Sequence, residues 1–113
     1  MSLNVYLTTP ICEKCAHYED VYSSNITHNL GEMAGAAGIY EALWRPEEKA
    51  ITKAAQLIPI LQKGLDLLLG NPEYYKTFNS PNGWGMYEHF IEFVEEYLKA
   101  CKENPDTDVS ISR

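Results

Sequence analysis

The chain has 113 residues, of which 45% are hydrophobic and 12% aromatic, and its formal net charge is -7. This length and the aromatic content predict one ordered globular domain over residues 1–113. The negative charge repels phosphate backbones and anionic lipid surfaces, which argues against nucleic-acid and membrane partners. Three cysteines and the lack of a leader-like or membrane-spanning segment predict a cytoplasmic protein without a disulfide framework.

Alternating apolar side chains predict strands near both ends of the chain. Residues 3–8 alternate apolar and polar positions, and Pro10 is expected to end this strand. Residues 18–24 are rich in aromatic and β-branched side chains and predict a second strand, and residues 109–112 predict a third. Because no terminal strand is stable alone, we expect the N-terminal and C-terminal strands to pair in one small antiparallel sheet.

Helical spacing of apolar residues dominates the middle of the chain. The segment at 87–103 has the clearest pattern, and its Glu92 and Glu96 are interpreted as solvated charges on the polar face. Packed on one face of the sheet, the helices give an α+β fold. The other predicted helical segments are a helix from Thr27 that stops at Gly38, a first turn at Pro46, a helix over 52–69 that Pro59 kinks or divides, and a short turn over 72–78.

Polar and aromatic side chains are densest between residues 25 and 48. His28, close to a helix start, is a candidate general base, but no serine or cysteine stands in a recognisable nucleophile context. The sequence therefore favours a protein that is not an enzyme. Asn25 and Asn29 fit capping and turn roles as well as they fit ligand binding.

Two interpretations are open for Trp44, Arg45 and Glu48. In the first, Arg45 stacks on an exposed Trp44, and Trp44 and Trp84 anchor an interface with another protein. In the second, Trp44 is buried and Arg45 pairs with Glu47 or Glu48. Trp84, in a loop between two glycines, has the same ambiguity.

Cys12, Cys15 and His17 form a metal-like cluster, because two thiolates separated by two residues can hold one zinc ion from a tight turn. A fourth ligand is required, and His28 is the candidate. Without metal, the two cysteines are free thiols in a surface loop. Cys101 falls in the apolar stripe of the last predicted helix.

Three segments of the chain are distinctive: NITHNLGEMA, GIYEALWRPEE and FNSPNGWGMYE. They resemble a family of small uncharacterised phage, prophage and bacterial proteins. The resemblance covers most of the chain and implies no catalytic residue. By analogy, it implies a phage-related accessory or host-interaction role.

The sequence thus supports two functional hypotheses of different classes. The first is a non-enzymatic cytosolic protein that contacts a partner protein or a second copy of itself through Trp44, Arg45 and Trp84. The second is a site for a small molecule or for a metal ion, with zinc as the metal. A concave pocket in which the candidate side chains converge would support this hypothesis. Its candidate residues are Asn25, His28, Asn29 and Arg45, with Cys12, Cys15 and His17 nearby.

Overall fold

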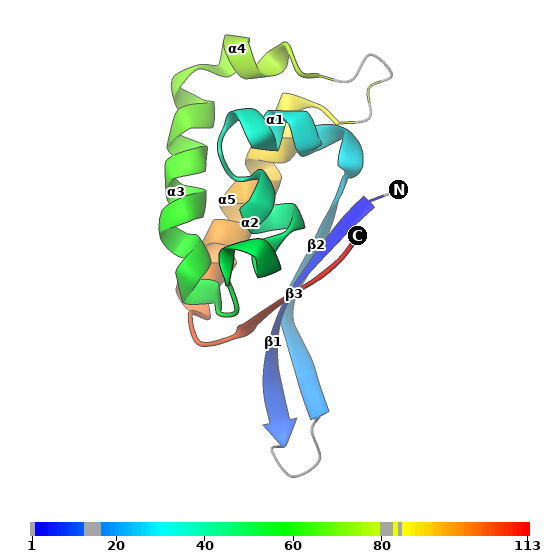
Figure 1. Cartoon of the computed structure of the whole chain (residues 1–113), viewed down its shortest axis with the longest axis vertical. Helices are drawn as coiled ribbons and strands as arrows, with labels where there is room; N and C mark the ends of the chain where they lie inside the picture. Colours follow the sequence, from blue (N-terminus) through cyan, green and yellow to red (C-terminus); the bar gives the residue numbers. More distant parts are fainter. Residues whose placement is uncertain (1, 13–16, 80–82, 84) are drawn as a thin grey trace.

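One three-stranded antiparallel sheet joins the two ends of the chain. The computed structural model describes residues 2–12, 17–79, 83 and 85–113 (Figure 1). The strands are β1 (Ser2–Cys12), β2 (His17–Thr27) and β3 (Asp108–Ser112), in the order β2-β1-β3. The N-terminal and C-terminal strands therefore pair, and the predicted α+β fold is confirmed (Figure 1).

The alternation in β1 places Leu3, Val5 and Leu7 on the inner face of the sheet, where each is 0% exposed. β3 pairs only with residues 4–8 of β1, whereas β2 pairs with β1 along its whole length. Beyond Thr8 the two long strands continue as a two-stranded arm. Figure 1 shows this arm extending beyond the helices.

The predicted end of the first strand at Pro10 is wrong. β1 continues to Cys12, and Pro10 is the register partner of Tyr18. β3 ends its pairing at Thr8, so the outer edge of β1 is unpaired at Pro10 among the described strands. A proline on an open edge removes no ladder hydrogen bond, which explains why the strand continues through it.

The helical segments fill the middle of the chain, as predicted. The helix expected from Thr27 is divided into a 3-10 turn and a short α-helix, and a further helix precedes Pro46. Pro59 does not divide α3, because Pro59 and Ala55 lie on its exposed side, where water can bond the carbonyl left free. The elements are η1 (His28–Leu30), α1 (Gly31–Ala36), α2 (Tyr40–Trp44), η2 (Pro46–Lys49), α3 (Ala54–Gly70), α4 (Pro72–Lys76) and α5 (Tyr87–Glu103).

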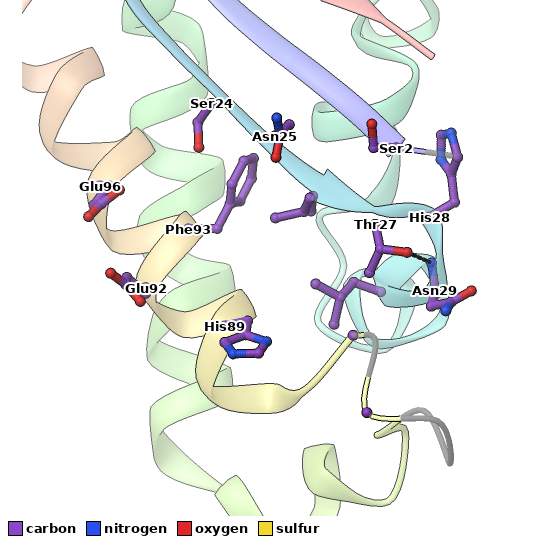
Figure 2. Close-up of a pocket in the computed structure, with 14 residues that line it drawn as sticks. Ser2, Ser24, Asn25, Thr27, His28, Asn29, His89, Glu92, Phe93 and Glu96 are labelled. Carbon is purple, nitrogen blue, oxygen red and sulfur yellow. Dashed lines mark hydrogen bonds between the residues drawn. The ribbon is translucent and has the colours of Figure 1, made fainter.

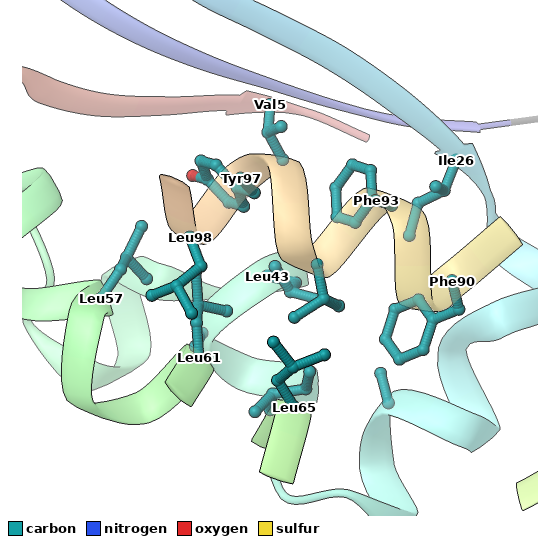
Figure 3. Packing of buried hydrophobic residues seen from close by; sticks show 14 of the residues in the cluster. Val5, Ile26, Leu43, Leu57, Leu61, Leu65, Phe90, Phe93, Tyr97 and Leu98 are labelled. Carbon is teal, nitrogen blue, oxygen red and sulfur yellow. The ribbon is translucent and has the colours of Figure 1, made fainter. Parts of the chain in front are cut away.

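The core lies between the sheet, α5 and α3. Figure 3 shows Phe93 and Tyr97 of α5 facing Val5 and Ile26 of the sheet. The buried leucines of α3 pack on the other side of α5. Tyr97 is 0% exposed, and its ring stacks on that of Tyr22, with centroids 5.8 Å apart. This aromatic stack fixes β2 on α5.

The beginning of α3 is joined to the beginning of β3. The first N–H groups of a helix lack partners within the helix, and here Ala54 and Ala55 donate to the carbonyls of Thr107 and Pro105, both at 3.0 Å. Val109 donates its N–H to the carbonyl of Thr52 at 2.9 Å. None of the helices in the described ranges has the length and apolar character needed to cross a bilayer.

Helix α3 approaches Ile39 closely at Gly64. A Cβ added there would lie 2.3 Å from Cγ2 of Ile39. We therefore expect Gly64→Ala to lower the free energy of unfolding by about 1–3 kcal/mol, measured by urea denaturation. Gly35→Ala in α1 is the control, because no described atom lies within 4 Å of the added methyl group. A Gly64→Ala protein as stable as wild type would contradict the packing.

Burial makes Cys101 unreactive in the folded protein. Its side chain is 0% exposed, and burial raises the pKa of its thiol to about 12. At pH 8 the reactive thiolate is therefore scarce. In a Cys12→Ser/Cys15→Ser protein, which retains one of the three cysteines, we expect Ellman's reagent to react at least about 100-fold more slowly in buffer than in urea. Similar rates in the two solvents would show that α5 leaves the thiol accessible.

Candidate functional site

A groove of about 930 Å³ lies between the end of β2, the turn η1 and one side of α5 (Figure 2). Three of the residues singled out from the sequence, Asn25, His28 and Asn29, line it together. This convergence is what the second hypothesis required of those three side chains. The lining residues are Ser2, Ser24, Asn25, Ile26, Thr27, His28, Asn29, Leu30, Gly83, Gly85, His89, Glu92, Phe93 and Glu96.

The hydrogen-bond pattern of the sheet determines which backbone groups of β2 are free. Val109 directs its N–H away from β1, toward Thr52. Its register partner Leu7 therefore forms a non-hydrogen-bonded pair with it, and Leu7 directs its own N–H and C=O toward β2. Leu7 is paired with Tyr22. Tyr22 consequently points its backbone groups inward, at β1.

Because this direction alternates along a strand, the neighbours of Tyr22 present the free edge. From Ser23 the register with β1 is regular to the end of β2, so Ser23 and Asn25 direct their N–H and C=O groups outward, and Thr27 directs its N–H outward. The C=O of Thr27 belongs to the turn η1, of which Thr27 is the N-cap. Among the described residues, β2 pairs with β1 alone. The edge of the sheet at the groove is thus open for further hydrogen bonds.

Helix α5 forms the opposite wall of the groove. His89, Glu92 and Glu96 are exposed there, and Phe93, 4% exposed, contributes its buried ring to the floor. No ion pair within the described part of the chain neutralises Glu92 or Glu96. The wall is therefore acidic as well as polar.

The position of these glutamates at a groove was missed from the sequence. Glu92 and Glu96 each precede a buried aromatic residue, Phe93 and Tyr97, which places them at the border of the apolar stripe. That neighbourhood is the signal that could have distinguished them from charges on the fully solvated face. Ser24, Thr27 and His89 were likewise not singled out.

One end of the groove is closed by Gly85. Its φ of 108° is in a region that favours glycine, and an added Cβ would lie 3.0 Å from Cβ of Asn29 and 3.2 Å from Cγ2 of Thr27. Thr27 Oγ1 accepts a hydrogen bond from the N–H of Asn29 at 3.3 Å (Figure 2). Thr27 thus caps the turn η1 and fixes this end of the groove.

His28 is held by the tryptophan behind it. Trp44 Nε1 donates to Nδ1 of His28 at 2.8 Å, so the imidazole accepts at Nδ1 and carries its proton on Nε2. The indole is 3% exposed and stacks on Tyr40, with ring centroids 5.3 Å apart. The interpretation of Trp44 as an exposed interface anchor under a stacked Arg45 is therefore wrong, because the ring fills the core.

Arg45 and Glu48 lie away from the groove. Arg45 Nε is 3.5 Å from Oε2 of Glu48, and both side chains are exposed. The second interpretation, an arginine paired with Glu48 beside a buried Trp44, is thus confirmed. Neither residue lines the groove. Trp84 is outside the described residues, so its predicted role as an anchor stays a prediction.

Two members of the predicted zinc cluster, Cys12 and His17, lie at the far end of the arm. Cys12 and His17 are register partners there, and Cys15 is outside the described residues, so zinc binding stays a prediction. His28 as the fourth ligand is wrong, because β2 separates it from His17 by roughly 30 Å. Among the side chains that the structure describes, no group of three or more histidines, cysteines, aspartates or glutamates could hold a metal ion.

A second hollow, of about 510 Å³, lies between α3 and the end of α1. Most of its lining is apolar, and it contains none of the candidate binding or metal residues named from the sequence. It gives no candidate site. Its lining residues are Ala36, Ala37, Gly38, Pro59, Ile60, Lys63, Gly64 and Leu67.

The groove therefore combines an open strand edge, two unpaired carboxylates, two imidazoles and an apolar floor. These groups provide hydrogen bonds, charge and apolar contact area for binding. Comparison with known proteins adds no relative from which a function could be transferred: no family model, curated protein or solved structure matches this chain.

Proposed function

We propose that this protein is a non-enzymatic binding domain that captures an extended segment of a partner protein as an additional strand beside β2. The observation that carries the proposal is the position of the groove along the open edge of the sheet. An extended segment at such an edge gains main-chain hydrogen bonds from the strand and specificity from its alternate side chains. The edge of β2 offers the main-chain hydrogen bonds, and the groove offers contacts for the side chains.

Residues 21–27 of β2 lack two of the features that usually block pairing at a sheet edge. Exposed edges are usually protected by charged side chains, proline or a covering element. Residues 21–27 of β2 contain no charged residue and no proline. Ser23 and Asn25, whose backbone groups point outward, are exposed. A segment added there would continue the sheet over the wall formed by His89, Glu92 and Glu96 of α5.

A segment that pairs with the edge of β2 must bind more weakly when one of the outward N–H groups of β2 is removed. Ser23→Pro removes the N–H of Ser23 without breaking the pairing with β1, since that group points away from β1. Ser23→Ala keeps the N–H and is the matched control. We expect peptides selected on wild type from a random displayed library to bind Ser23→Ala normally and Ser23→Pro about 10-fold or more weakly.

Two further measurements identify the bound position and the kind of occupant. Bound peptide should slow the exchange of the amide hydrogens of Asn25 and Thr27 in the Ser23→Ala protein. Selection that yields no binder, or binders indifferent to Ser23→Pro, would overturn the proposal. So would sedimentation of wild type as a dimer that Ser23→Pro converts to a monomer, because a second copy would then occupy the edge.

A further inference from the structure

We propose that the captured segment carries two basic side chains at alternate positions, which contact Glu92 and Glu96 when the segment pairs with β2. This inference rests on the proposed strand addition and specifies the chemistry of its partner. It depends on the charge of the groove wall, on the spacing of the two carboxylates and on the apolar floor beside them.

The charge of the wall is uncompensated. Glu92 and Glu96 are exposed, and no arginine or lysine of the described residues pairs with either. The formal net charge of -7 adds a negative field around the groove. An acidic segment would be repelled from this wall, whereas a basic one would be attracted and held in register.

The carboxylate of Glu96 acts at the strand itself. Burial is the main cause of the raised pKa of Tyr22, and the negative charge of Glu96 raises it further. Tyr22 belongs to the part of β2 that stacks on α5. The field of Glu96 therefore reaches the strand beside which the segment would lie.

The spacing of the two carboxylates fits an extended chain. Glu92 and Glu96 are four residues apart on α5, which corresponds to a rise of about 6 Å. Side chains two residues apart in a strand point to the same face and are separated by about 6.6 Å. Two basic residues with one residue between them can therefore contact both glutamates at once. Adjacent basic residues point to opposite faces and cannot.

Phe93 favours long basic side chains in the captured segment. Phe93 stands between Glu92 and Glu96 in the chain, and its ring contributes to the groove floor. Lysine and arginine side chains bury their methylene groups on such a surface, and their charged ends can then reach the carboxylates.

The test compares three peptides on three proteins, and each peptide carries fluorescein on its N-terminus and an amide at its C-terminus. The peptide TKVKVT places two lysines on one face, TKKVVT has the same composition with the lysines on opposite faces, and TSVSVT is neutral. The proteins are wild type, Glu92→Gln/Glu96→Gln, and the control Glu95→Gln/Glu103→Gln. The control removes two exposed carboxylates of α5 that do not line the groove. Its net charge therefore changes by the same amount as that of Glu92→Gln/Glu96→Gln.

Fluorescence anisotropy at low salt should show TKVKVT binding to wild type about 3- to 10-fold more tightly than TSVSVT or TKKVVT. We expect Glu92→Gln/Glu96→Gln to abolish this preference and the control to retain it. A preference that survives Glu92→Gln/Glu96→Gln would overturn the inference, because net charge alone would explain it.

The outcome separates this inference from the function on which it rests. If TKVKVT binds no better than TSVSVT, or not at all, while random selection still yields peptides sensitive to Ser23→Pro, the basic pattern is wrong and strand addition stands. If random selection yields none, strand addition itself fails.

Discussion

The pairing of β3 with one edge of β1 is the constraint on which the rest of the structure depends. It makes β1 the central strand and leaves β2 at the edge of the sheet. The same pairing brings the turn before β3 to the first N–H groups of α3, which donate to its carbonyls. Helix α3 then holds α5 against the inner face of the sheet (Figure 3). The open edge of β2 and the wall of α5 thus owe their relative position to contacts at the opposite side of the molecule.

Local sequence patterns were sufficient for most of the elements. The alternation of Leu3, Val5 and Leu7 predicted an inner face that the structure confirms, and the apolar spacing of α5 predicted its buried side. Pro10 does not end β1 and Pro59 does not divide α3, for one common reason. A proline disrupts a strand or helix only where its missing N–H or its ring meets a neighbour, and the unpaired strand edge or the exposed helix side shows whether a neighbour is present.

The groove could be predicted only in part. Asn25, His28 and Asn29 were recognised because they are close in sequence, at the junction of a strand and a turn. Glu92 and Glu96 come from a distant helix, and their role depends on how α5 is rotated against β2. The stack of Tyr22 on Tyr97 sets that rotation. The spacing of apolar residues describes each segment separately, so it cannot predict such a contact between two distant segments.

The position of β3 also has a consequence for synthesis. Roughly 100 residues separate β1 from the strand that pairs with its second edge. While a ribosome produces the intervening helices, the emerging hairpin of β1 and β2 exposes two unpaired edges and the apolar row of Leu3, Val5 and Leu7. Contacts of such long sequence separation form slowly, and unpaired edges invite association between chains. We therefore expect the nascent chain to be most prone to aggregation just before its last strand emerges.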